Sequence, residues 1–243
     1  MDGAELCIRF AYITNKLRYC GPEKAQPAFH RYLLHRDNLP EVREDIRRFE
    51  GLYPYLDAIA KKAGKDFLDR EVVEAYWLGN GLLDGFSDAE MKDVIRSLEA
   101  RGLPASIARK RIDELPQGMF PHHDFNVFYV GVGNITQSVE ATLPNMDNCR
   151  IGWGKVVEVV SKDTALVMTP ALQKKKGKIA MGKEEPKTVV FLPEVTSVAE
   201  GDLVALHWGF IVMRLSREQQ YRLQTYQERL LRQLGGPGNQ PVA

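Results

Sequence analysis

The stretch Cys149–Val160, CRIGWGKVVEVV, most constrains the fold of this chain, because a glycine-punctuated turn there leads directly into a run of β-branched residues. Alternating apolar and polar side chains are the pattern of a strand that is buried on one face. Further short runs of strand-forming residues follow at 164–168, 188–192 and 203–215, separated by turn residues. Several short strands with such turns predict a small β-barrel.

The chain before residue 140 has a different pattern, in which apolar side chains recur at helical spacing. Leu52, Leu56 and Ile59 lie about one turn apart, and Ser87–Glu90 has the sequence of a capping box before the next apolar stripe. A second capping box, Ser216–Gln219, opens a helix after the last predicted strand. Together these patterns predict an α+β chain.

Three segments follow from these changes of pattern. We expect a mostly helical domain over residues 1–145, a small β-barrel with a C-terminal helix over residues 146–236, and a disordered tail over residues 237–243. The sequence Gly-Gly-Pro from residue 235 predicts the end of the last helix, because glycine and proline both interrupt helices.

The composition argues against several functional classes. The formal net charge is +1, whereas general nucleic-acid and membrane-surface binders carry a clear basic excess. No run approaches the roughly 18 apolar residues that span a bilayer, and the N-terminus lacks the apolar core of a secretory signal. Three cysteines are an odd number for a disulfide framework and fit a reducing compartment. We therefore expect a cytoplasmic protein that binds neither nucleic acid nor membrane.

Cys149 is the residue on which the predicted function depends. A thiolate is a soft metal ligand and a nucleophile, but cysteine is also among the residue types most often buried for packing alone. His207 lies within the apolar run Leu203–Phe210, where a lone histidine is more often a packing residue than a ligand. His207 gains a chemical role if the barrel brings it beside Cys149.

A secondary site is predicted from Cys20, His122 and His123. The run Phe125–Val132 is rich in aromatic and β-branched residues and predicts a strand. Adjacent histidines on a strand point to opposite faces, so a single chelating site that uses both is disfavoured, and a turn or interface role is favoured. Cys20 precedes Gly21-Pro22, so a small residue packed at a turn is the alternative to a second thiol near an interface.

Sequence motifs of conventional enzymes are missing. The chain has no phosphate-binding glycine loop, CxxC pair, HExxH or GxSxG. The basic cluster Lys174–Lys178 lacks interleaved aromatic residues, so we interpret it as a solvated loop rather than a nucleic-acid site. We therefore expect a protein that is not an enzyme and has no catalytic residues.

Two motifs resemble the HypC/HupF hydrogenase maturation chaperones. Cys149–Val159 is similar to the start of those proteins, which is a cysteine followed by apolar residues, Pro-Gly-Lys-Val and a strand. Gly201–Phe210 is similar to their second hallmark, which is Gly-Asp, apolar residues, histidine, one residue and Gly-Phe. Both motifs stand in the family's order at roughly its spacing, and the resemblance covers residues 149–234, including the helix after Ser216.

The resemblance implies an OB-like barrel in which Cys149 is the iron-handling thiolate and His207 stands at the family's strand histidine. Those chaperones work with the scaffold protein HypD, hold iron that carries cyanide and carbon monoxide, and deliver it to the immature large subunit of nickel–iron (NiFe) hydrogenase. The implied function is a chaperone that presents Cys149 to the Fe(CN)2CO group or to a partner. The implied partners are a HypD-like scaffold, the hydrogenase large subunit, or both, and the helical domain would recognise them.

Two alternatives to this function stay open. One is a metal-free interaction module that binds a hydrogenase subunit, and the other is a thiol enzyme in which His207 activates Cys149. The chain also departs from the chaperones at two positions. Their cysteine carries a free terminal amine, whereas Cys149 is internal and has an amide nitrogen, and Trp153 stands where they have proline.

The whole chain also resembles an uncharacterised bacterial family encoded near hydrogenase genes. The features that carry this second resemblance are Tyr19–Pro22, Glu74–Asn80 and the pair His122-His123. It implies an association with hydrogenase but no biochemical activity.

Overall fold

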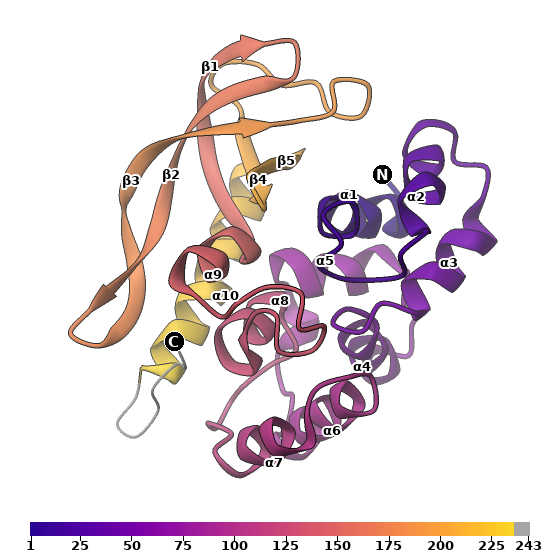
Figure 1. Cartoon of the computed structure of the whole chain (residues 1–243), viewed down its shortest axis with the longest axis vertical. Helices are drawn as coiled ribbons and strands as arrows, with labels where there is room; N and C mark the ends of the chain where they lie inside the picture. The colour runs from indigo at the N-terminus through magenta and orange to yellow at the C-terminus, as the bar shows by residue number, and fades with distance from the viewer. Residues whose placement is uncertain (236–243) are drawn as a thin grey trace.

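The computed structural model describes residues 1–235 and has an α+β fold (Figure 1). A helical region comes first, a five-stranded mixed sheet closed into a barrel follows, and one helix ends the described chain. The predicted α+β class and the small barrel with its C-terminal helix are therefore confirmed. The predicted disordered tail over residues 237–243 lies outside the described residues.

The helical region contains nine α-helices and two short helices of other types. Their bounds are α1 (Gly3–Lys16), α2 (Ala25–His35), α3 (Leu39–Arg47), α4 (Tyr53–Ala63), α5 (Arg70–Leu78), η1 (Gly81–Leu83), α6 (Asp88–Glu99), α7 (Ala105–Asp113), α8 (His123–Phe125), η2 (Asn126–Gly131) and α9 (Leu143–Cys149). Both hydrogen bonds of the predicted capping box at the start of α6 are present.

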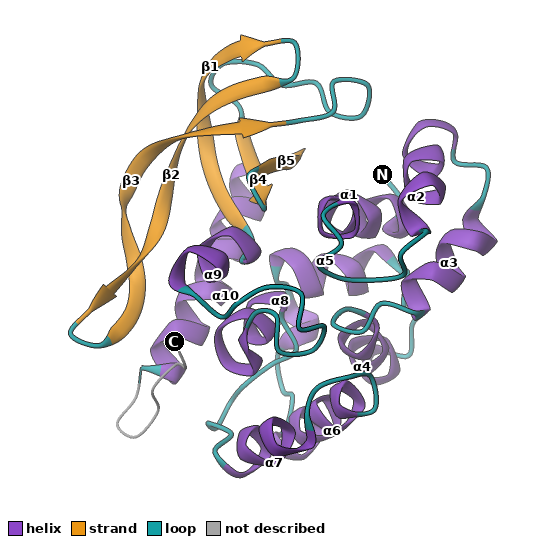
Figure 2. Ribbon diagram, in the orientation of Figure 1, coloured by secondary structure: helices purple, strands orange, loops and turns teal. Residues whose placement is uncertain are grey.

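The barrel is built from β1 (Gly152–Ser161), β2 (Thr164–Lys175), β3 (Lys178–Val190), β4 (Leu203–His207) and β5 (Phe210–Arg214). The strands follow the order β1-β2-β3-β5-β4 around the barrel, and all neighbours are antiparallel except β3 and β5. The ends of β2 and β3 project from the barrel as a long hairpin, and the predicted loop Lys174–Lys178 forms its tip (Figure 2). The run predicted as one strand over 203–215 is two strands joined by Trp208 and Gly209.

Helix α10 (Arg217–Leu234) lies between the barrel and the helical region, together with α8 and α9 (Figure 1). Its predicted capping box at Ser216 is present. At one crossing the Tyr226 ring packs so closely on the chain that a Cβ at Gly79 would lie 2.2 Å from it, and Gly79 has a φ of +81°. This glycine ends α5 and allows the close approach.

The described residues form two hydrophobic cores, one inside the barrel and one that extends from the helical region to the barrel. A small core fills the barrel and includes Val156, Val167 and Ile211. A larger core runs through the helical region and includes Ala205 and Met213, on β4 and β5. Because this larger core contains side chains from both parts, the barrel packs on the helices with the side that contains β4 and β5.

The strand predicted over Phe125–Val132 is wrong, because these residues belong to α8 and η2 and end in a turn. Val127, Phe128 and Val130 are at most 1% exposed, and the run is buried apart from the half-buried Asn126. Aromatic and β-branched residues suit any fully buried segment, and periodicity alone does not separate a short buried strand from a buried helix. Helix α9 lies between this run and the barrel, and the Thr142 hydroxyl caps its first turn.

Within the described part of the chain, the helices are all too short or too polar to cross a membrane.

Candidate metal site

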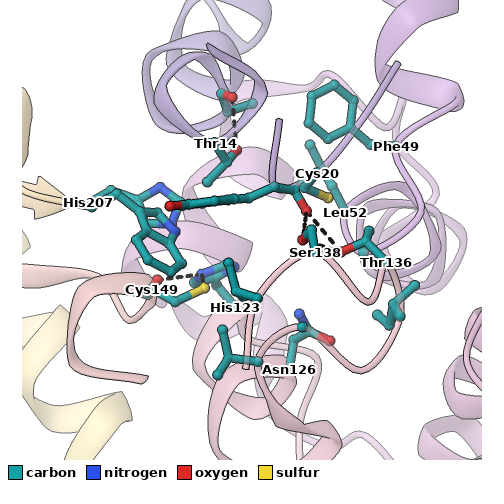
Figure 3. Close-up of a pocket in the computed structure, with 18 of the residues that line it drawn as sticks. Thr14, Cys20, Phe49, Leu52, His123, Asn126, Thr136, Ser138, Cys149 and His207 are labelled. Carbon is teal, nitrogen blue, oxygen red and sulfur yellow. Dashed lines mark hydrogen bonds between the residues drawn. The ribbon is translucent and has the colours of Figure 1, made fainter. Parts of the chain in front are cut away.

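Three potential ligand atoms from distant parts of the sequence meet at the junction between the helices and the barrel. They belong to His123, Cys149 and His207, and all lie within 4.8 Å of one another (Figure 3). His123 begins α8, Cys149 ends α9 and His207 ends β4. The three side chains form a group that could hold a metal ion.

The turn between β4 and β5 brings His207 to Cys149. Trp208 and Gly209 have φ values of 51° and 70°, as in a two-residue type I′ hairpin turn. The backbone N–H of Trp208 donates a hydrogen bond to the carbonyl oxygen of Asn148 at 2.7 Å. Since Asn148 precedes Cys149, this bond fixes the barrel turn against the end of α9.

Buried polar contacts also hold the residues beside Cys149. Arg150 is only 2% exposed, and its guanidinium pairs with the Asp147 carboxylate at 2.9 Å. The fully buried Asp124 carboxylate accepts hydrogen bonds from the backbone N–H of Ile151, at 3.2 Å, and from the side chain of Gln227 on α10. Segments of the helical region, α10 and the barrel therefore constrain the position of Cys149 together.

His207 presents a free ring nitrogen to the site. Its Nδ1 lies 2.9 Å from the carbonyl oxygen of Phe10, which can only accept, so Nδ1 carries the proton. Burial lowers the pKa of His207 to about 4, so the ring is neutral at pH 7 and Nε2 has a lone pair. The side chain is 1% exposed, and Nε2 has no hydrogen-bond partner among the described residues. An unpartnered buried nitrogen of this kind is costly unless a ligand occupies the position beside it.

His123 is held on both sides of its ring. Its Nδ1 lies 3.0 Å from the hydroxyl oxygen of Tyr76, and its Nε2 lies 2.9 Å from the carbonyl oxygen of Cys149. The Tyr76 hydroxyl also lies 3.0 Å from the carbonyl oxygen of Gly51. Burial and the nearby His207 hold the pKa of His123 well below its usual value.

This hydrogen-bond chain accommodates both tautomers of His123. In one, Nε2–H donates to the Cys149 carbonyl and the Tyr76 hydroxyl donates to Nδ1. In the other, Nδ1–H donates to the Tyr76 oxygen, the Tyr76 hydroxyl donates to the Gly51 carbonyl, and Nε2 is free to bind a metal ion. The two forms carry the same number of protons, so a change between them releases no net proton.

The Cys149 thiol is protonated when no cation is present. Burial, and to a smaller extent Cys20 and Asp124, raise its pKa, while the indole N–H of Trp208 opposes this effect. The Cys149 Sγ lies 4.0 Å from the His123 Nε2. A tetrahedral site with nitrogen and sulfur ligands needs ligand atoms about 3.5 Å apart. Small side-chain rotations would therefore bring this group to ligation distance.

A cavity of about 60 Å³ adjoins the three ligand atoms. Cys20 lies on the opposite side of this cavity from Cys149 (Figure 3). The Tyr19 ring packs on Trp208 with their centres 4.4 Å apart, so both aromatic rings cover the site. A volume of this size accommodates an ion with a few water-sized groups.

The residues predicted from the sequence divide between two places in the structure. Cys149 and His207 lie together, His123 lies with them, and Cys20 lines the same cavity. His122 lies apart, since its Nδ1 accepts the backbone N–H of Asp124 at 3.1 Å and burial lowers its pKa to about 3. The two histidines point in different directions from a helical segment rather than from the two faces of a strand.

The sequence predictions missed Trp208 and Tyr76 as parts of the site. Trp208 lies within the motif that singled out His207, and Tyr76 lies within a segment that carried the resemblance to the uncharacterised bacterial family. Both residues could have been found as neighbours of predicted site residues in those motifs. Their roles as cover of the cavity and partner of His123 depend on contacts across more than 40 residues of sequence.

Fold and site together define a protein with a helical region, a five-stranded barrel and a buried three-donor group where the two meet. Comparison with protein families places the chain by sequence. It belongs to the family of unknown function DUF6390, whose model matches residues 1–236. Searches of curated proteins and of solved structures found no match.

Proposed function

We propose that this protein is a cytoplasmic metal-handling chaperone for NiFe-hydrogenase assembly. Its Cys149, His123 and His207 side chains bind iron, and the Fe(CN)2CO group is the cargo that Cys149 receives and presents. The observation that carries the proposal is the convergence of these three donors, one of which is a buried nitrogen without a partner. The resemblance of the Cys149 and His207 motifs to the HypC/HupF chaperones supplies the choice of cargo.

The donor types support a transition metal. Imidazole nitrogen and thiolate sulfur suit iron, zinc and copper, whereas magnesium and calcium prefer oxygen ligands. Burial keeps His123 and His207 neutral, which is the form that binds a metal. The ligand bonds compensate for the cost of deprotonating the buried Cys149 thiol.

The partners in this proposal are a HypD-like scaffold, the hydrogenase large subunit, or both. A cargo bound near Cys149 would leave or arrive through the cavity that Tyr19 and Trp208 cover. The helical region supplies two of the ligands, His123 and Cys149, and most of the cavity wall. Its proposed role is therefore to recognise the partner at the site where the cargo is exposed.

The raised pKa of Cys149 favours a ligand over an activated nucleophile. A thiol enzyme needs a thiolate near neutral pH, and burial here opposes that form. The metal-free interaction module remains the competing proposal, with Cys149 as a packing residue. Metal analysis separates it from the chaperone, because a packing cysteine predicts no bound metal and no change in metal content when Cys149 is replaced.

Anaerobic purification from a host that makes NiFe-hydrogenase tests the proposal. We expect iron in the wild-type protein, together with infrared bands of cyanide and carbon monoxide, and the loss of both in Cys149→Ala. Cys7→Ala is the matched control, because Cys7 is completely buried and outside the cavity. Iron without these bands would refute the proposed cargo, and wild-type protein without any metal would refute the metal site.

A further inference from the structure

We propose that Cys20 is the fourth ligand of this site when the ion carries no cyanide or carbon monoxide, so that the bound ion then has two cysteine and two histidine ligands. The proposal rests on the metal site described above and adds a ligand from the loop between α1 and α2. Figure 3 shows Cys20 on the other side of the cavity from Cys149 and His207. In the structure Cys20 is outside the group of atoms within 4.8 Å, so this loop has to move its thiol into the cavity.

The cavity wall contains two sulfur donors among its described residues. They are Cys149 and Cys20, and the imidazoles of His123 and His207 are the nitrogen donors. The other polar groups of the wall include the hydroxyls of Thr14, Tyr19, Tyr76, Thr136 and Ser138 and the amide of Asn126. Neutral oxygen atoms of this kind compete poorly with a thiolate for a soft or borderline ion.

The three close donors leave one position of a tetrahedral ion unfilled. His207 Nε2 is buried and unpartnered beside the cavity, so an ion bound there would face the space that Cys20 borders. Two cysteines and two histidines are a common closed set for zinc, whereas three protein ligands leave a position for water or substrate. With Cys20 bound, the ion would have four protein ligands and no position for water or substrate. Without Cys20, one position would stay open.

The Cys20 thiol has a single, long contact to another side chain in its present position. Its Sγ lies 4.0 Å from the Glu50 carboxylate, at the limit of a sulfur hydrogen bond, whereas the same carboxylate accepts the Gly21 N–H at 3.0 Å. A change of the Cys20 side chain to another staggered rotamer moves Sγ by about 3 Å. The thiol proton passes to solvent when the sulfur–metal bond forms.

The loop around Tyr19 has to supply the rest of the movement of the Cys20 thiol. Hydroxyl groups hold its carbonyl oxygen, those of Thr136 at 2.9 Å and Ser138 at 2.7 Å. Both residues lie in the irregular segment before α9, and Ser138 is exposed. The side-chain amide of the buried Asn15 also donates a hydrogen bond to the Cys20 carbonyl oxygen at 3.2 Å. A movement of Cys20 towards the ligands therefore has to break or rotate about these bonds.

Cobalt(II) added to the metal-free protein tests the proposal, because each thiolate bound to cobalt adds to the sulfur-to-cobalt charge-transfer absorption. We expect wild-type protein to show the intensity of two thiolates. Cys20→Ser and Cys149→Ser should each show about half, and Cys7→Ala, which removes a thiol outside the cavity, should equal wild type. X-ray absorption at the cobalt edge should count two sulfur ligands in wild type and one in Cys20→Ser.

Equal absorption in Cys20→Ser and wild type, with loss in Cys149→Ser, would overturn the role of Cys20 and leave the three-donor site intact. Wild-type protein that binds no cobalt would instead overturn both. Circular dichroism and thermal unfolding of metal-free Cys20→Ser should match wild type. If this variant is unfolded, Cys20→Ala in the sulfur count takes its place, and two remaining sulfur ligands would then refute the proposal.

Discussion

Because the Cys149 thiol is protonated, we predict that the metal affinity of the site depends on pH. In the Cys20→Ser variant, Cys149 is the remaining thiol that lines the cavity, and its raised pKa means that it is protonated at pH 6 to 8. A metal ion has to displace that proton, so affinity rises with pH. His207, with a pKa of about 4, is already neutral over this range and releases no proton. His123 is also neutral, and its two tautomers carry the same number of protons, so a change from the Nε2–H to the Nδ1–H form releases no net proton.

One released proton corresponds to a tenfold change of the dissociation constant per pH unit, or about 1.4 kcal/mol. Between pH 6 and pH 8 the dissociation constant of Cys20→Ser should therefore fall about a hundredfold. Since the pKa of Cys149 is raised, no plateau is expected within this range. A second thiolate ligand in wild-type protein should make the dependence twice as steep.

Competition with a chelator at pH 6, 7 and 8, corrected for protonation of the chelator, measures this dependence. Cys20→Ser with Cys149→Ser is the control, and its affinity should be weaker and nearly independent of pH. The reasoning is refuted if the affinity of Cys20→Ser does not change with pH, because the thiol would then play no part in binding.

Three further substitutions test individual contacts. Tyr76→Phe removes the hydroxyl that holds His123 and should weaken metal binding roughly 10- to 100-fold and stability by about 1–2 kcal/mol, measured by chelator competition and urea unfolding. Glu90→Gln should cost about 0.5–1 kcal/mol at pH 7, because the Lys62 ammonium holds the Glu90 pKa down at about 2 but the carboxylate is 39% exposed. This loss should disappear as the pH falls from 4.5 to 2 and the carboxylate of the wild type is protonated. Gly79→Ala should cost about 2 kcal/mol or more in urea unfolding, because it places a methyl group against a tyrosine ring of α10 at a positive φ.

Two control variants, each matched to one of these substitutions, test the assigned contacts. Tyr55→Phe removes a buried hydroxyl that bonds to Asn126 and should leave metal affinity unchanged. Gly81→Ala meets no atom within 4 Å and should cost far less than Gly79→Ala. Equal effects within either pair would contradict the assigned contacts, as would a Glu90→Gln loss that persists at pH 2.

Local sequence signals predicted much of the fold. The two capping boxes, the alternating run after Cys149 and the turn glycines gave the helices on either side and the barrel between them. These signals are local, since a cap or a strand period depends on residues a few positions apart. The segment Phe125–Val132 was predicted as a strand because its burial comes from contacts that are distant in sequence.

The candidate site was predicted only in part for the same reason. The spacing of two motifs brought Cys149 and His207 into one hypothesis, and the structure places them in one group. His123 joins that group because α8 directs it differently from a strand. The unpartnered Nε2 of His207 follows from its bond to Phe10, which is 197 residues away in sequence, so no local pattern contains it.

The turn at Trp208 lowers the stability of the backbone, but its side chain covers the cavity. A large side chain at a φ of 51° is strained, at a cost on the order of 1–3 kcal/mol, and glycine or asparagine would suit this backbone better. Either replacement would remove the indole that packs on Tyr19 and lies beside Cys149. Selection for thermal stability alone would therefore favour a cavity without this cover. A variant library screened for stability should gain small residues at position 208, and these variants should lose bound metal.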